Sequence, residues 1–388
     1  MLKFKMGVIE RHFYYPQRKY LPQKCVLVGV ILSCYYSTEY GESRCVRMND
    51  FEIGPIRPPS ESSSLLIRVT RGCHWNKCYF CGLYKSMKFS MRPIEDIISD
   101  IKIQSEQNVG QRYKSCFLQD GDALVLKTEY IIRILDALRQ YNPSLESITT
   151  YARADSITRK SLSDLKLLRE HGLNHLYCGM ETGADSILQL INKGFNSDTV
   201  IRSGCLAKEA DMTLSEFILL GIGGKEYSEE NARKTAEALN IIKPDFIRVH
   251  ATGFKTGSMM WRLIQNGTIT LQSEEEIVQE QRLFLQSLNK MDSYYVNEHI
   301  INLLLEVRGN LLTEKRQMLS DIDRFLRLPP EERLLFVVGR RLNIFFFLDD
   351  LQKPELRRQA ETYIDKIKKE NPHVDFTLLC NYVRQAQI

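Results

Sequence analysis

Short apolar stretches alternate with amphipathic segments along most of the chain, from residue 65 onward. The apolar stretches have the length and composition of strands, and the segments between them repeat hydrophobic residues with the period of an α-helix. Alternating strands and helices form parallel sheets with right-handed crossovers, so we predict an α/β fold, an open partial (β/α)6 barrel. The predicted strands are residues 65–70, 115–119, 147–152, 174–179, 213–220 and 245–250, and the clearest helices are Ile94–Gln104, Tyr130–Gln140, Leu162–His171 and Glu229–Ile241.

The last third of the chain has helical patterns without intervening strands. The sequence therefore predicts three parts. Residues 1–59 form a leader and lead-in, of which 1–47 integrate poorly; residues 60–260 form the core domain; and residues 261–388 form a helical domain that covers the open side of the barrel. The helices expected in this last part are Glu274–Leu288, Val296–Val307, Leu312–Leu326 and Leu356–Lys368.

Three closely spaced cysteines follow the first predicted strand. Cys73, Cys78 and Cys81 have the spacing C-x4-C-x2-C on a loop at the carboxyl end of that strand, where open α/β sheets place their chemistry. Three thiolate ligands hold one face of a metal centre and leave a coordination position open, as a catalytic iron–sulfur cluster requires. The loop is therefore predicted to bind such a cluster.

Other uses of these thiols stay open at this point. A zinc ion would need a fourth ligand, with His74 or a distant Cys or His as the candidate, and no second C-x2-C pair occurs in the chain. Incidental buried thiols are a further alternative. A disulfide framework has little support, because the other seven cysteines are scattered in a chain too long to need covalent staples.

Alternation within the predicted strands indicates which side chains face the barrel lumen. In residues 246–251 the aliphatic side chains suit the helix-covered side, which turns Arg248 and His250 inward. Arg153 and Glu181 take inward positions near the ends of two other strands. Each charged group alone could be a satisfied salt bridge, but several converging on one mouth favour a functional site. Arg248 and His250 are therefore candidate catalytic residues.

Several further motifs occur in a fixed order after the cysteines, and together they resemble the radical S-adenosylmethionine (SAM) superfamily, in its elongator-type and coproporphyrinogen-dehydrogenase-like branch. The resemblance covers about residues 60–260. Two departures occur: the first cysteine gap has four residues where three are usual, and Asp120-Gly-Asp122 stands where the family has Gly-Gly-Glu. The motifs are Phe117–Ala123, Tyr151–Ser156, Gly179–Leu188 with Lys193-Gly194, and Phe217–Gly224.

The resemblance implies a [4Fe–4S] cluster on Cys73, Cys78 and Cys81, with SAM chelating the fourth iron. One-electron reduction by a donor such as flavodoxin or ferredoxin would cleave SAM to methionine and a 5′-deoxyadenosyl radical, which abstracts hydrogen from a substrate. The resemblance also implies cofactor-binding roles: Phe80 beside the adenine, Asp120, Gly121 and Asp122 at the methionyl amino group, Glu181 at the ribose or amino group, Arg153 at the methionyl carboxylate, and Gly221 and Ile222 along the adenine.

Composition limits the classes of partner and the compartment that we expect. The net charge of +5 is spread along the chain without a basic block, so a nucleic-acid partner is not expected. No stretch approaches the roughly 18 apolar residues of a membrane span, and a thiol cluster suits a reducing compartment, so we expect a cytoplasmic protein. The substrate is expected to be small or medium-sized. The alternatives are a non-catalytic zinc-binding or interaction protein and a coproporphyrinogen-type oxidative decarboxylase.

Overall fold

The computed structural model describes residues 51–107 and 113–386. Its described residues fall into two compact units, one within residues 51–329 and 373–386 and one of residues 330–372. The predicted boundary at residue 260 thus falls within the larger unit. The predicted leader, residues 1–47, lies outside the described residues.

The larger unit is built on an eight-stranded sheet in the order β1-β4-β5-β6-β7-β8-β9-β10. Neighbouring strands from β1 to β9 run parallel, and β10 is antiparallel to β9. The predicted α/β class with a mostly parallel sheet is confirmed. The strands are β1 (Leu65–Arg68), β4 (Ser115–Gln119), β5 (Ser147–Ala152), β6 (Leu173–Glu181), β7 (Thr213–Leu220), β8 (Phe246–Ala251), β9 (Tyr294–Val296) and β10 (Gly309–Asn310), and β2 (Thr70–Arg71) pairs with β3 (Ser90–Met91) in a separate ribbon.

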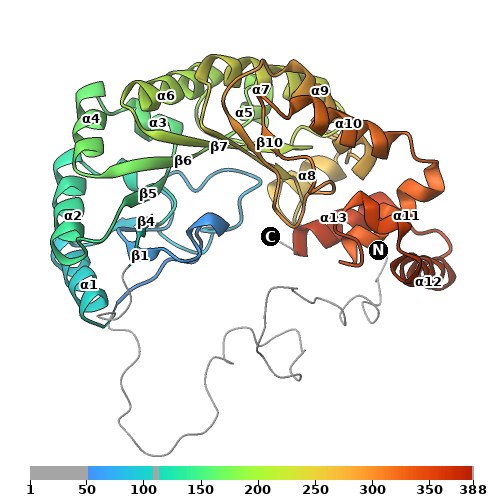
Figure 1. The fold of residues 1–388 in the computed structure, drawn as a ribbon, viewed down its shortest axis with the longest axis horizontal. Helices are drawn as coiled ribbons and strands as arrows, with labels where there is room; N and C mark the ends of the chain where they lie inside the picture. Colours follow the sequence, from blue (N-terminus) through green and yellow to red (C-terminus); the bar gives the residue numbers. More distant parts are fainter. Residues whose placement is uncertain (1–50, 108–112, 387–388) are drawn as a thin grey trace, which may run out of the picture. The chain divides into compact units, whose positions relative to one another are not determined.

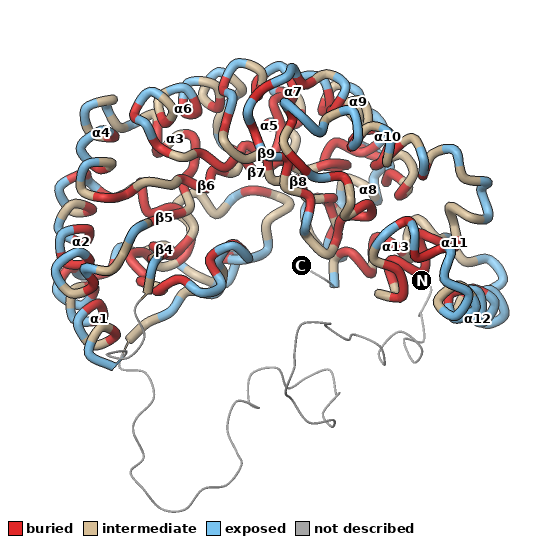
Figure 2. Tube along the Cα trace, in the orientation of Figure 1, coloured by how far each residue is buried: buried red, intermediate tan, exposed pale blue. Residues whose placement is uncertain are grey.

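Helices follow the strands and lie outside the sheet, as Figure 1 shows for α1, α2, α4 and α6. Their inner faces are buried and their outer faces exposed (Figure 2), because apolar residues recur at helical spacing. In α2, for example, Ile131, Ile134, Leu135 and Leu138 are buried. The helices of this unit are α1 (Ile94–Gln107), α2 (Thr128–Tyr141), α3 (Ala154–Thr158), α4 (Leu162–Glu170), α5 (Asp185–Leu190), α6 (Ser197–Glu209), α7 (Ser228–Ile242), α8 (Met259–Gln265), α9 (Glu274–Ser287), α10 (Lys315–Leu326) and α13 (Phe376–Ala386).

The smaller unit contains α11 (Pro330–Arg341) and α12 (Pro354–Glu370), joined through the short 3-10 helix Leu348–Gln352. Phe336 and Phe345 stack within it, and Arg357 on α12 pairs with Glu332 on α11. In both units, none of the helices in the described ranges is long and apolar enough to cross a bilayer.

The helix predicted over Val296–Val307 is wrong. Strand β9 ends at Val296, and the chain continues as a loop that asparagine side chains hold against β8. Asn302 accepts a hydrogen bond from the Ala251 N–H at 2.7 Å and donates to the Val249 carbonyl at 2.7 Å. Asparagine side chains that satisfy backbone groups in this way compete with helix formation, although the apolar spacing is helical.

The lumen of the barrel is lined by aromatic side chains. In strand register, Tyr151 pairs with Tyr177, Tyr177 with Ser215, and Ser215 with Phe246. At the amino end of the strands, the Tyr177 hydroxyl donates to Glu61 at 2.7 Å, from the short 3-10 helix Pro59–Glu61. This bond joins the 3-10 helix before β1 to β6, and the carboxyl ends of the strands face the cysteine loop.

Candidate functional site

The three cysteines lie together on the loop that leaves β2. All three are free thiols; Cys78 is buried, while Cys73 and Cys81 are partly exposed. Burial raises the pKa of Cys81, and the neighbouring Cys78 and Cys73 raise it further. The three thiols therefore lie near one another at the carboxyl ends of the strands.

Asp120 fastens the start of this loop. Its Oδ2 accepts from Arg68 Nη2 at 2.5 Å and from the Gly72 N–H at 2.8 Å. A Cβ at Gly54 would lie 1.9 Å from Asp120 Oδ1, so the chain before β1 covers this carboxylate. Burial raises the pKa of Asp120, although Gly72 and Arg68 favour its charged form. The carboxylate predicted to meet a methionyl amino group is thus engaged with Arg68 and the loop backbone.

His74 fastens the loop a second time, through two carboxylates. Its Nδ1 lies 3.1 Å from Asp122 Oδ2, and its Nε2 lies 3.4 Å from Asp155 Oδ2. Asp122 and Asp155 together raise the pKa of His74 to about 9, which makes the imidazole a cation at neutral pH. Asp122 also accepts from the Ser156 hydroxyl at 2.5 Å. The second predicted amino-group ligand therefore also serves to hold the cysteine loop.

The far end of the loop packs against residues 191–195. The Trp75 indole N–H donates to the Asn192 carbonyl at 2.9 Å. A Cβ at Gly194 would lie 2.5 Å from the Trp75 ring, so only glycine allows this approach. Arg153 lies over the Trp75 ring at 5.6 Å, and its Nη1 is 4.0 Å from Cys78 Sγ. A guanidinium beside a cysteine sulfur provides positive charge next to a metal-bound thiolate.

Lys193 and Glu181 form a buried ion pair beside the same cysteines, with Lys193 Nζ 2.6 Å from Glu181 Oε1. Glu181 ends β6 at an irregularity of the strand register and has a φ of 65°. Burial opposes the charge of Lys193, but Glu181 and then Cys78 raise its pKa. Lys193 connects Glu181 to Arg153, because its backbone carbonyl accepts from Arg153 Nη2 at 2.8 Å.

The turn after β7 provides an apolar wall. Ile222 is fully buried in a cluster against which Phe80 and Leu219 pack. Gly221 has a φ of 78°, and its N–H donates to the buried Glu280 of α9 at 2.9 Å. Phe80 and Ile222, predicted to flank one ligand, therefore belong to one surface. Gly121 lies on the other side of the loop, where a Cβ would be 3.2 Å from the Cβ of Cys73.

Arg248 and His250 lie on the inner face of β8, as predicted. Both are half-buried, while their outward neighbours Ile247 and Val249 are buried. The His250 ring lies 4.4 Å from the His299 ring, centroid to centroid. Burial, His299 and Arg248 lower the pKa of His250 to about 3, and burial lowers that of His299 to about 4. Both imidazoles are therefore neutral at physiological pH.

These histidines, with His175, predict a loss of stability on acidification. Burial and then Arg248 lower the pKa of His175 to about 4. Because the unfolded chain binds a proton on each histidine near pH 6.5 and the folded chain does not, stability should fall as the pH drops below 6.5. Each histidine lowers the free energy of unfolding by about 1.4 kcal/mol between pH 7.5 and 5.5. Urea unfolding of His250→Phe should show a correspondingly smaller difference between these two pH values, and an unchanged difference would contradict the assignment.

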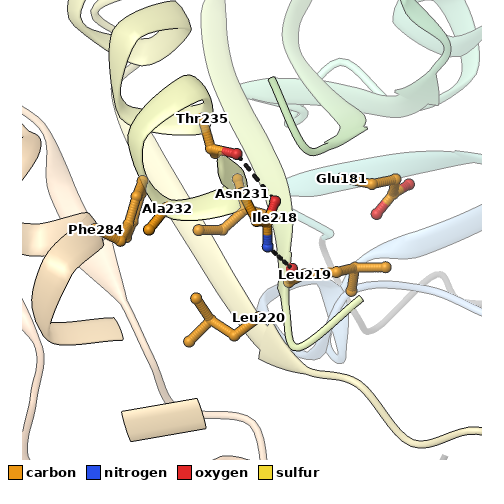
Figure 3. Close-up of a pocket in the computed structure, with 8 residues that line it drawn as sticks. All are labelled: Glu181, Ile218, Leu219, Leu220, Asn231, Ala232, Thr235 and Phe284. Carbon is orange, nitrogen blue, oxygen red and sulfur yellow. Dashed lines mark hydrogen bonds between the residues drawn. The ribbon is translucent and has the colours of Figure 1, made fainter. Parts of the chain in front are cut away.

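The packing space between β7 and α7 is a different feature. Figure 3 shows the residues that line it, with Asn231 donating to the Leu219 carbonyl at 3.0 Å and the Glu181 carboxylate directed away from α7. The space is too small for a water molecule. It is part of the packing of the helix on the sheet.

The comparisons with known proteins concern the same part of the chain. Residues 67–239 match the model of the radical SAM superfamily. These residues form a radical SAM domain. The chain is 21% identical over 231 residues to the heme chaperone HemW of Bacillus subtilis, covering 58% of this chain and 59% of HemW. It is 26% identical over 191 residues to the tRNA-2-methylthio-N(6)-dimethylallyladenosine synthase of Thermodesulfovibrio yellowstonii, covering 47% of this chain and 41% of that protein.

Among solved structures, coproporphyrinogen III oxidase (HemN) from Escherichia coli superposes with a TM-score of 0.45 at 20% identity, covering 57% of this chain and 52% of HemN. The chain thus spans less than two thirds of the length of these curated relatives.

Members of the radical SAM superfamily use a [4Fe–4S] cluster and SAM, and the donors present in this chain fit the cluster. The ligand set is three free thiols beside two cations, Arg153 and Lys193, which suits an anionic thiolate-bound cluster. Within the described ranges, no three His, Cys, Asp or Glu side chains are arranged to share one metal ion. This finding includes Cys73, Cys78 and Cys81, so the cluster assignment rests on the chemistry of the donor set and not on the arrangement of the three thiols.

Several residues of the radical SAM domain were missed as site residues from sequence. Arg68, Asp155 and Trp75 fix the cysteine loop, and Lys193 carries a buried charge next to it. Lys193 could have been identified from the sequence, because it stands in one of the motifs that carry the resemblance. The indication for Arg68 was weaker, because it is a charged residue inside an apolar strand.

Proposed function

We propose that this protein is a radical SAM enzyme that reductively cleaves SAM and uses the resulting radical on a small or medium-sized substrate. The observation that carries the proposal is the cysteine loop, which two buried carboxylates fasten at the carboxyl ends of the strands beside Arg153 and Lys193. The match of residues 67–239 to the superfamily supports it.

In this proposal Cys73, Cys78 and Cys81 hold the [4Fe–4S] cluster. When bound, the cluster supplies one electron to the sulfonium of SAM, which breaks its carbon–sulfur bond to give methionine and a 5′-deoxyadenosyl radical. The three thiols sit on a loop whose contacts with Asp120 and His74 fix its position without using the sulfur atoms. A one-electron donor such as flavodoxin or ferredoxin would approach this exposed loop, where Lys77 and Lys85 lie at the surface.

The remaining residues would position SAM. Arg153 and Lys193 present positive charge suited to a carboxylate, and Glu181 presents a carboxylate suited to an ammonium or ribose hydroxyl. Phe80, Gly221 and Ile222 form an apolar wall suited to the adenine. Asp120 and Asp122 act by positioning the cysteine loop, because Asp120 Oδ2 already binds Arg68 and Gly72, and Asp122 already contacts His74 and Ser156.

The test is release of 5′-deoxyadenosine. The protein is loaded anaerobically with iron and sulfide, given dithionite and SAM, and its products are separated by chromatography. We expect release by the wild type and by Cys205→Ala, whose thiol is exposed on α6, and loss of release in Cys78→Ala. Absence of 5′-deoxyadenosine from a fully loaded wild type would overturn the proposal, and so would undiminished release by Cys78→Ala.

A further inference from the structure

Arg248 differs from the other buried or half-buried arginines of the barrel in its partners. Arg68 pairs with Asp120, Arg92 with Asp100, and Arg153 with Asp155. Arg248 instead donates from Nε to the Ser215 hydroxyl at 3.1 Å and lies over the Tyr177 and Phe246 rings at 5.1 and 5.6 Å. In the described ranges no carboxylate forms an ion pair with it. Placing a guanidinium in a partly enclosed site costs free energy unless an anion pairs with it.

Glu61, the acid that contacts the Tyr177 hydroxyl, already accepts two hydrogen bonds. Glu61 accepts from the Tyr177 hydroxyl at 2.7 Å and from the Ser64 hydroxyl at 2.5 Å. The charge of Arg248 acts on its surroundings instead, and it helps to keep both His175 and His250 neutral. With the imidazoles uncharged, the positive charge on this side of the lumen comes from Arg248.

The position of Arg248 suits a ligand below the cofactor. It lies three residues before Ala251, the last residue of β8, which places it about 10 Å below the carboxyl end of the strand. In register it pairs with Phe217, whose ring lies 5.4 Å from the His250 ring. Phe217, Tyr151 and His250 are all half-buried on the inner face, so a planar or apolar body has aromatic surfaces to contact.

We infer that the barrel lumen binds a small organic anion, whose carboxylate or phosphate pairs with Arg248 while its planar or apolar body contacts Phe217 and Tyr151. This inference rests on the proposed function, because it names the substrate class of the same site. The neutral rings of His250 and His299 lie beside this position as hydrogen-bonding groups that add no charge.

The experiment uses three probes of one shape. Benzoate, phenyl phosphate and the uncharged benzamide are titrated by calorimetry into the cluster-loaded, SAM-bound protein. We expect at least one anion to bind about tenfold tighter than benzamide, the size of one charge-assisted pair. Arg248→Gln should abolish this preference, Arg248→Lys should retain part of it, and Arg233→Gln on the exposed face of α7 should retain all of it. Whichever of benzoate and phenyl phosphate binds tighter identifies the anionic group.

Equal or absent binding of the anions and benzamide to the wild type would overturn the inference, and so would a preference that survives in Arg248→Gln. Iron content and circular dichroism of each variant show whether it folds and loads normally. The 5′-deoxyadenosine assay is run in parallel without probe. If the protein prefers anions through Arg248 but never cleaves SAM, the inferred anion site holds and the proposed reaction is wrong. If it cleaves SAM without that preference, the proposed reaction holds and the anion site is wrong.

Discussion

Replacing Asp120 with asparagine is expected to lower the free energy of unfolding by about 3 kcal/mol, since it removes the buried partner of Arg68. This value is at the low end of the cost of breaking a buried ion pair, because Glu52 still contacts Arg68 Nη1 at 2.7 Å. The start of the cysteine loop also loses its charged acceptor at the Gly72 N–H, so the variant should retain less iron after gel filtration. Urea unfolding and iron analysis measure the two effects.

Two comparisons make the Asp120 result specific. Asp211→Asn, at an almost fully exposed carboxylate that pairs weakly with Arg169, should change stability by less than about 1 kcal/mol. In the fraction of Asp120→Asn that keeps its cluster, SAM affinity should equal that of the wild type. If SAM affinity fell while stability and iron content stayed normal, Asp120 would be a SAM ligand, as the sequence first indicated, and the positioning role would be wrong.

Replacing Lys193 with methionine is expected to cost about 3–5 kcal/mol of stability, because it leaves the Glu181 carboxylate buried without its cation. The double variant Glu181→Gln/Lys193→Met should recover most of this loss, since both charges are then removed. SAM binding should stay weak in both variants. Urea unfolding gives the stabilities, and equilibrium dialysis of the cluster-loaded protein gives the SAM affinity.

The double variant separates folding from binding at this pair. If it recovered SAM affinity together with stability, Glu181 and Lys193 would serve the fold alone. Lys208→Met is a matched control, because Lys208 and Asp245 form a pair at 2.6 Å that is about one third exposed. Removing that lysine should cost less than about 1 kcal/mol and leave SAM binding unchanged.

The strands were predictable because their signal is local. β4, β5 and β7 have the bounds expected from the sequence, since each is a short run that contains apolar, aromatic or β-branched residues typical of strands. The region 296–307 shows the limit of such patterns. Its apolar spacing is helical, but Asn297 and Asn302 bind backbone groups of the loop and of β8, and only the folded chain shows those partners.

The candidate site likewise has features that the sequence predicted and features that only the fold shows. The cysteine loop was evident from spacing, and the inward positions of Arg248 and His250 followed from strand alternation. The partners of Asp120 and Asp122 were not evident, because Arg68 precedes Asp120 by 52 positions and His74 precedes Asp122 by 48. A carboxylate in a motif can bind a ligand or an arginine, and its burial and neighbours decide between them.

The short strand β9 has an evolutionary consequence. It lies outside the repeated strand–helix units, yet the loop that follows it brings His299 to the side of His250. The cysteines, Arg153, Lys193 and Glu181 all belong to earlier segments of the chain. Related proteins could therefore change the length or sequence of residues 297–308 and accept new substrates, while the part of the chain that would generate the radical is inherited intact.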